Sequence, residues 1–192
     1  MADPPTGGEE LNDPDPRLVS RARAGDLEAF EDLVRLYQAD VWRFAYHLTR
    51  DRTMAEDVTQ EAFLRAFRFL STFRGDARFS SWLLRIVRNC GMDALRRRRS
   101  DQQREYPPPE GAPDPATRTE LAMAVDALSQ DHRQPFLLIE VFGLSYQEAS
   151  DVLAVKVGTV KSRMHRARQA LVKALSEAEA AEADEGGTGG GL

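Results

Sequence analysis

The sequence predicts an all-α protein with two small helical domains joined by a proline-rich linker. Two observations favour this fold class. Along both halves of the chain, apolar residues recur at intervals of three and four, which is typical of helices that bury one face, and no segment alternates apolar and polar residues as a half-buried strand does. Between the halves, five prolines fall within residues 100–116, a density that excludes a helix and favours an extended linker. We therefore place a domain boundary at this linker.

The first predicted domain spans residues 16–99 and contains four helices. Residues of the types that cap helix N-termini mark the four starts, in chain order Asp15 followed by Pro16, Asp26, Thr53 with Glu56 as a capping box, and Ser80 or Ser81. The first helix is short and ends near Gly25. Apolar spacing predicts that the third helix turns Phe69 inward, and the fourth helix ends in the basic run 96–99.

The second predicted domain also contains four helices. They cover residues 117–175 and begin at about Ala116, Ser129, Ser145 and Gly158. Apolar spacing turns Leu121 of the first of these helices inward, and Pro135 is expected to lie near the start of the second or to kink it. Ser145 and Glu148 are spaced as a capping box, and a turn at 154–157 separates the last two helices.

The two ends of the chain differ from the rest in composition. Residues 1–15 and 176–192 are rich in acidic residues, proline or glycine, and we expect both to be disordered tails. Each end carries five acidic residues and no basic one, so the net charge of −5 conceals a central segment with a net charge of +5. Basic residues concentrate on both sides of the linker, which indicates a polyanionic partner.

Composition also excludes several classes of protein. No apolar run approaches the ~20 residues that span a bilayer, and the N-terminus lacks the basic and apolar regions of a signal peptide, so we expect a cytoplasmic protein without membrane insertion. Cys90 is the single cysteine, and the three histidines lie far apart in sequence, so we expect no disulfide, no metal site and no cofactor. Without a phosphate-binding glycine loop or a histidine–carboxylate pair at useful spacing, the sequence does not predict an enzyme.

The last two predicted helices form a helix-turn-helix. Five apolar residues recur along the last helix at steps of 3, 4, 3 and 4 and share one face: Val157, Val160, Met164, Ala167 and Leu171. The opposite face carries small and basic residues, and residues 155–175 contain six basic residues and no acidic one. Such a helix suits the DNA major groove, where Lys and Arg bind phosphates or guanine edges and Ser162 binds either. The alternative is a solvated basic helix on an ordinary helical bundle.

Three segments of the chain resemble sigma factors of the extracytoplasmic-function (ECF) group of the sigma-70 superfamily. The DNA-binding region of that group is similar to LSYQEASDVLAVKVGTVKSRMHRARQAL, residues 144–171. The helix with which these factors bind RNA polymerase is similar to AEDVTQEAFLRAF, residues 55–67, and the segment that recognises and melts the promoter −10 element is similar to FRGDARFSSWLLRIVRN, residues 73–89. Ala154 departs from the family pattern, which has glycine there, and alanine fits a left-handed helix end less well.

The resemblance implies roles for particular residues. For the promoter −35 element it implies major-groove contacts from Lys156, Gly158, Thr159, Lys161, Ser162, Arg163 and Arg166. For the −10 element it implies recognition and melting by Phe73, Arg74, Asp76, Arg78, Phe79, Trp82, Arg85, Arg88 and Asn89. For core RNA polymerase it implies contacts with the clamp helices of the largest subunit from Asp57, Gln60, Glu61 and Arg65.

The residue types in the segment 73–89 suit DNA melting. Unstacked bases need a substitute for lost stacking, and an aromatic ring supplies ~1–3 kcal/mol per base. The alternative is that the aromatic residues are core residues that anchor a loop, namely Phe73, Phe79 and Trp82. For Trp82 this core interpretation is at least as well supported as base contact. For the polar residues of the adjoining loop the DNA-binding interpretation is favoured, namely for Arg74, Asp76 and Arg78.

We therefore expect an initiation factor that binds core RNA polymerase, recognises the −35 and −10 elements, helps to melt the −10 region and starts transcription of a specific regulon. The resemblance also implies control by an anti-sigma factor. A competing hypothesis is a stand-alone helix-turn-helix repressor or activator, which accounts for residues 116–175 but not for the segment 73–89. In a third hypothesis, the polar face of the first domain is purely a protein-interaction surface, and replacing Asp57 and Gln60 with Ala then leaves polymerase affinity unchanged.

Overall fold

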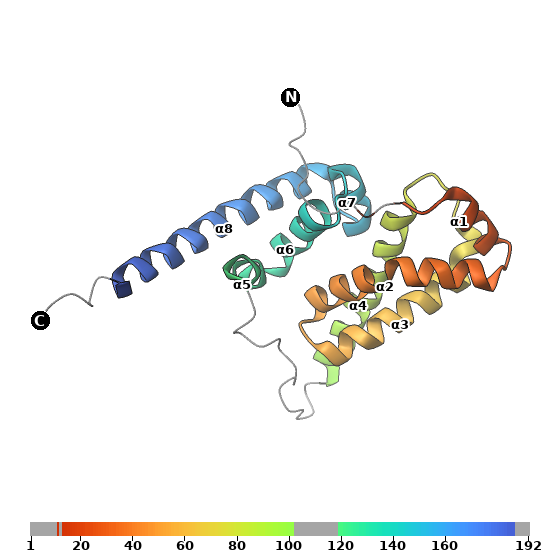
Figure 1. Cartoon of the computed structure of the whole chain (residues 1–192), viewed down its shortest axis with the longest axis horizontal. Helices are drawn as coiled ribbons and strands as arrows, with labels where there is room; N and C mark the ends of the chain where they lie inside the picture. The colour runs from red at the N-terminus through yellow and green to blue at the C-terminus, as the bar shows by residue number, and fades with distance from the viewer. Residues whose placement is uncertain (1–10, 12, 102–118, 187–192) are drawn as a thin grey trace, which may run out of the picture.

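Figure 1 shows a computed structural model of the chain, which describes residue 11, residues 13–101 and residues 119–186. Every regular element within these residues is helical, as the sequence predicts. None of the helices in these ranges combines the length and the apolar character that a bilayer span requires. The all-α fold class is therefore confirmed.

The first helices of the described chain form the N-terminal domain. They are α1 (Pro16–Arg23), α2 (Leu27–Thr49), α3 (Arg52–Phe69), the short 3-10 turn η1 (Leu70–Thr72) and α4 (Phe79–Asp101). Asp15 and Asp26 cap α1 and α2 as predicted, because their carboxylates accept backbone N–H groups of the first helical turn. The cap of α3 is Asp51, two residues before the predicted Thr53, and its carboxylate accepts the Met54 N–H at 3.0 Å.

The core of this domain lies between α2, α3 and α4. Tyr37, Phe44 and Leu83 are each at most 2% exposed. Gly91 of α4 allows the close approach of α2, because a Cβ at this position would lie 3.1 Å from the Cδ1 atom of Leu48. The long helices thereby hold the segment 73–89 on a rigid base.

Phe69 does not follow the predicted pattern. Its side chain is 54% exposed, whereas the adjacent Leu70 is 2% exposed. The reason is that α3 ends at Phe69 and the tighter turn η1 rotates the following residue toward the core.

The C-terminal domain contains the remaining helices of the described chain. They are α5 (Glu120–Ala127), α6 (Gln130–Phe136), the π-helical turn η3 (Leu137–Val141), α7 (Tyr146–Leu153) and α8 (Val157–Gly186). The predicted capping box is present, since the Glu148 N–H donates to the Ser145 hydroxyl at 3.2 Å and the Ser145 N–H donates to the Glu148 carboxylate at 2.8 Å. Pro135, which has no N–H, lies inside α6, and the helix widens into η3 two residues later. Leu121 is 51% exposed rather than inward, because the buried residues of α5 all lie in its second half.

Two predicted boundaries shift toward more helix. α8 continues to Gly186, so the first part of the predicted disordered tail 176–192 is helical, in keeping with the strong helix propensity of its alanine and glutamate residues. α4 includes Ser100 and Asp101 of the predicted linker 100–116. The rest of that linker and the last residues of the tail lie outside the described residues.

The N-terminal tail is also described in part. We predict disorder for residues 1–15, but Leu11 and Pro14 are buried, so this prediction is wrong for them. Residues 1–10 and 12 lie outside the described residues.

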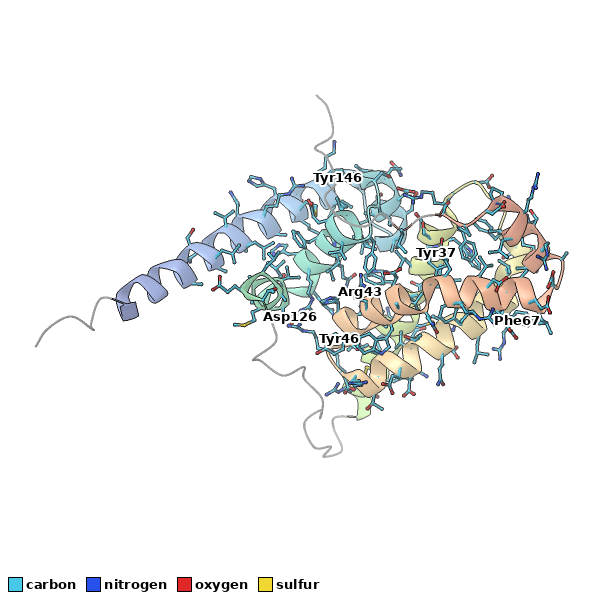
Figure 2. The ribbon with its side chains drawn as sticks, in the orientation of Figure 1. Tyr37, Arg43, Tyr46, Phe67, Asp126 and Tyr146 are labelled. Atoms are coloured by element: carbon cyan, nitrogen blue, oxygen red, sulfur yellow. The ribbon has the colours of Figure 1, made fainter. Side chains whose placement is uncertain are left out.

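The two domains lie against each other, with α7 packed on α4 and α6 on α2 (Figure 1). The rings of Phe44 in α2 and Phe142 after η3 meet edge to face, with centroids 5.6 Å apart. Two polar contacts also join the domains. The Gln130 amide donates to the carbonyl of Leu48 at 2.8 Å. Asp126 of α5, which is labelled in Figure 2, forms an ion pair with Arg50 at the end of α2. One cluster of buried apolar residues therefore runs through both domains.

Candidate nucleic-acid interface

The turn between α7 and α8 sets the angle between these helices. Ala154 adopts a left-handed backbone, with φ 53° and ψ 45°, and its N–H donates to the carbonyl of Ser150. The Ser150 hydroxyl donates to the carbonyl of Val155 at 2.7 Å, and the Val155 N–H donates back to the Ser150 carbonyl at 3.2 Å. Alanine thus closes the turn in the conformation that glycine favours.

The polar face at the start of α8 is open to solvent. Of the predicted −35 contacts, those that are exposed are Lys156, Gly158, Lys161, Ser162 and Arg166. A Cβ placed on Gly158 would meet no atom within 4 Å, so this part of the backbone can be approached from outside. Val160 and Met164 on the opposite side are 0% and 1% exposed and fix the rotation of the helix. The accessible surface carries small and basic side chains, which suit close contact with a DNA groove.

The remaining predicted −35 contacts are partly occupied within the C-terminal domain. Arg163 is half-buried, and its Nη2 atom lies 2.9 Å from the carboxylate of Asp131. Thr159 is also half-buried. Lys161, although exposed, lies with its amine 5.9 Å from the ring centroid of Tyr146, which is labelled in Figure 2. This cation–π contact holds one positive charge beside the open face of α8.

The aromatic residues of the predicted −10 segment form a cluster. The ring centroids of Phe73, Phe79 and Trp82 lie 5.3–5.7 Å apart, and Tyr37 places a fourth ring 5.5 Å from Phe79. Phe73 and Phe79 are 8% and 4% exposed, and Trp82 is half-buried. In this conformation the rings pack as core residues, while the exposed predicted residues around them are Arg74, Asp76, Arg85 and Asn89.

The two remaining predicted −10 residues face the other domain. The Nε atom of Arg78 lies 3.8 Å from the carboxylate of Glu148 in α7. The Nε–H of Arg88 donates to the side-chain carbonyl of Gln134 in α6 at 3.2 Å. Burial, with the positive charge of Arg163 as a second cause, lowers the pKa of Arg88. Both guanidinium groups are therefore engaged by the C-terminal domain.

A groove of about 730 Å³ separates the two predicted DNA-binding segments. One wall comes from the loop before α4 and from α4 itself, and the other comes from α7 and the turn after it. Its polar lining includes Arg74, Asp76 and Arg85 on the first wall and Asp151 and Lys156 on the second. The structure thus brings predicted −10 and −35 residues to the same groove.

The predicted polymerase-binding residues on α3 divide into two groups. Asp57 and Gln60 are exposed. Glu61 and Arg65 are half-buried, and Arg65 donates to Glu61 at 2.6 Å and to an aspartate of α4 at 3.4 Å. The Glu61 hydrogen bond is the first cause of the raised pKa of Arg65. This second pair therefore links α3 to α4.

Two apolar residues extend the exposed face of α3 and are absent from the sequence prediction. Leu64 and Phe67 are 52% and 44% exposed, and Figure 2 places Phe67 on the N-terminal domain far from α8. With Asp57 and Gln60 they recur at steps of 3, 4 and 3, so all four share one face of the helix. The sequence signal that identifies Leu64 and Phe67 is this spacing from the two polar residues Asp57 and Gln60. Phe67 rests edge to face on Phe30 of α2, with centroids 5.0 Å apart.

The described residues do not offer the chemistry of a metal or thiol site. No group of three His, Cys, Asp or Glu side chains within them is placed to hold a metal ion. Cys90 is 1% exposed, and burial raises the pKa of its thiol, which disfavours the nucleophilic thiolate.

Comparisons with known proteins identify the family of this chain. The family model of sigma-70 region 2 matches residues 33–101, and that of sigma-70 region 4 matches residues 118–171. The RNA polymerase sigma-H factor of Pseudomonas aeruginosa is 37% identical over 180 residues, which cover 84% of this chain and 93% of that protein. The chain belongs to the sigma-70 family. The ECF RNA polymerase sigma factor SigW of Bacillus subtilis is 30% identical, covering 84% of this chain and 96% of that protein, and it supports membership of the ECF group.

A solved structure extends the similarity to this sigma factor's fold. The sigma factor RpoE, crystallised with the anti-sigma factor NepR from Bartonella quintana, matches with a TM-score of 0.64 and 28% identity over 77% of this chain and 96% of that one. Sigma factors are transcription initiation factors that bind core RNA polymerase and promoter DNA, so this sigma factor is not an enzyme.

Proposed function

We propose that this ECF sigma factor directs core RNA polymerase to the promoters of a specific regulon inside the cell. In this proposal α8 recognises the −35 element, and the segment 73–89 recognises the −10 element and helps to melt it. The observation that carries the proposal is the exposed basic face of α8 on the same chain as a region 2 domain. A stand-alone helix-turn-helix regulator does not require the second feature.

Contacts with the −35 element follow from the exposed surface of α8. In this proposal Lys161 and Arg166 bind phosphates or guanine edges, which their exposure supports, and the open space beside Gly158 accommodates the DNA backbone. Ser162, Lys156 and Thr159 border the same face. Arg163 joins them only after exchanging Asp131 for DNA, since the two side chains are paired at 2.9 Å.

Recognition of the −10 element requires the N-terminal domain to be released from the C-terminal domain. Arg74, Asp76, Arg85 and Asn89 are exposed in the closed arrangement, but Arg78 and Arg88 are held by the C-terminal domain. The rings of Phe73, Phe79 and Trp82 are packed together, and at least one must turn outward to stack on a base. We therefore infer that the free protein binds promoter DNA weakly and that polymerase supplies the open arrangement.

Binding to core polymerase is assigned to the outer face of α3. Asp57 and Gln60 supply the polar part, and Leu64 and Phe67 add an apolar centre of the kind that dominates protein interfaces. The clamp helices of the largest subunit are the expected partner of this face. Glu61 and Arg65 border it, and because they also link α3 to α4, they position the helix as well.

An anti-sigma factor is a further expected partner. The related RpoE structure contains one, the factor NepR. We infer that this chain has an anti-sigma partner of its own, which competes with polymerase.

The −35 assignment is tested with two arginines of α8. Arg166 is exposed on the proposed DNA face. The Nη2 atom of Arg168 lies 2.5 Å from the Glu140 carboxylate, and this hydrogen bond is the first cause of the raised pKa of Arg168. With purified core polymerase, Arg166→Ala is expected to weaken promoter binding about 10-fold to 100-fold and to lower the salt dependence by about one phosphate contact. Arg168→Ala removes the same charge from the same helix and is expected to change binding by less than about threefold, because its charge is already paired. Equal effects of the two substitutions contradict the assignment.

The competing function is separated by the requirement for polymerase. A sigma factor supports initiation by purified core enzyme and binds promoter DNA weakly when free. A chain that footprints DNA alone at physiological salt, and that fails to support initiation on the bound sequence, is instead a stand-alone regulator.

A further inference from the structure

Leu11, which precedes α1, packs at the boundary between the two domains. The Leu11 side chain is 6% exposed, although it lies in an acidic and proline-rich stretch of the sequence. Its N–H donates to the carbonyl of Phe142 in the C-terminal domain across 3.5 Å, and its carbonyl accepts a hydrogen bond from Arg78 in the N-terminal domain. Leu11 therefore contacts both domains at once. We call Leu11, Asp13 and Pro14 together the strap.

The strap is anchored at the start of α4. The Asp13 carboxylate accepts hydrogen bonds from the Ser80 hydroxyl at 2.9 Å, the Ser80 N–H at 3.2 Å and the Phe79 N–H at 3.3 Å. The first N–H groups of a helix lack partners within it, and a carboxylate there also interacts favourably with the helix dipole. A residue distant in sequence therefore supplies the cap of the helix that carries the proposed −10 residues.

Arg78 connects the strap to the C-terminal domain. Its guanidinium donates to the Leu11 carbonyl and lies 3.7 Å from the Asp13 carboxylate and 3.8 Å from the Glu148 carboxylate of α7. Glu148 also accepts a hydrogen bond from the Ser81 hydroxyl at 3.3 Å. Two groups of the strap and one of the C-terminal domain thus share a single proposed DNA-binding arginine.

We propose that the strap is an intramolecular autoinhibitory clasp, which holds the two domains closed and withholds Arg78 from promoter DNA. The proposal rests on the proposed function. A phosphate and the strap compete for the same guanidinium, so each lowers the affinity of the other by the same factor. Opening requires the Leu11 side chain to leave its buried site and α4 to lose the Asp13 cap. Polymerase or DNA that binds the start of α4 therefore releases the clasp.

The experiment measures the distance between the domains in the free, full-length protein. Fluorescent dyes are attached after the substitutions Leu36→Cys and Val172→Cys, at positions that are 48% and 66% exposed on different domains. Single-molecule energy transfer then gives the fractions of closed and open molecules. Leu11→Ala is expected to raise the open-to-closed ratio about tenfold, because it removes buried side-chain atoms from the residue whose backbone is hydrogen-bonded to both domains.

Two further variants separate loss of the clasp from loss of folding. Asp13→Asn keeps an oxygen that caps α4 but loses the charge opposite Arg78, so it is expected to open the chain without changing its helix content by circular dichroism. Asp15→Ala is the matched control, because Asp15 caps α1 within one domain through its hydrogen bond from the Arg17 N–H at 2.8 Å. It is expected to leave the open fraction unchanged.

The outcomes are decisive for the strap and independent of transcription. Opening of both Leu11→Ala and Asp13→Asn, with a closed Asp15→Ala, supports the clasp. A closed population that is unchanged in Leu11→Ala and Asp13→Asn overturns it, as does equal opening in Asp15→Ala. If the strap variants open but no form of the chain supports initiation by core polymerase, the clasp stands and the proposed function fails.

Discussion

The left-handed residue at the end of α7 gives a prediction that can be worked out from the backbone. Ala154 has φ 53°, and its side chain is exposed, so replacement by glycine leaves no cavity. A left-handed backbone costs about 1–2 kcal/mol for a residue with a Cβ atom. Glycine avoids that cost but loses about 0.5–1 kcal/mol more conformational free energy on folding. Ala154→Gly is therefore expected to raise the free energy of unfolding by about 0.5–1 kcal/mol.

Urea unfolding of the full chain measures this difference. Ala170→Gly is the control, since Ala170 is exposed within α8, and glycine in an ordinary helix lowers the free energy of unfolding by about 1 kcal/mol. The two substitutions are thus expected to have opposite signs. A loss of stability in Ala154→Gly equal to that of Ala170→Gly refutes the left-handed turn.

Three further predictions concern ionisation and polymerase binding. Burial raises the pKa of the Cys90 thiol. The stabilisation from the neutral thiol is therefore present below its unfolded-state pKa and is lost as the pH rises through its folded-state pKa. The free energies of unfolding of wild type and Cys90→Ala are expected to converge in alkaline buffer. The pKa of Asp26 is lowered, first by the hydrogen bond from the Ala29 N–H. The stabilisation from the Asp26 carboxylate is therefore present above its unfolded-state pKa and is lost as the pH falls through its folded-state pKa. In acid, the free energy of unfolding of Asp26→Asn is expected to approach that of wild type. Leu64→Ser is expected to weaken binding to core polymerase about tenfold. Gln38→Ala, at an exposed position of α2, is expected to leave this affinity unchanged. Equal affinities of the two variants would contradict the assignment of α3 to the polymerase interface.

Features set by neighbouring residues could be predicted from the sequence. Apolar spacing identified the helices, since the packing of one helical face depends on residues three and four apart. The capping box was found from the three-residue spacing of Ser145 and Glu148. Asp51 replaced Thr53 as the cap of α3 because these two residues, two positions apart, are both of types that suit a cap, and only the backbone decides which one accepts the N–H.

Features set by contacts between distant residues could not be predicted. Asp13 caps α4 by a hydrogen bond with Ser80, which lies 67 positions later in the sequence, and no local pattern predicts such a cap. The occupation of Arg78 and Arg88 depends on how the two domains meet. Leu64 was missed for a different reason, because an exposed apolar residue in a helix looks like a core residue until the helix is placed.

The measurement that tests the account most directly is transcription by purified core RNA polymerase with this chain, followed by mapping of the RNA start sites. The account predicts initiation only when the chain is added, at promoters that share two upstream motifs at a fixed spacing, with Arg166→Ala losing the response to the −35 motif. Absence of initiation, or start sites that share no upstream motif, would contradict a factor that reads one promoter with both of its domains.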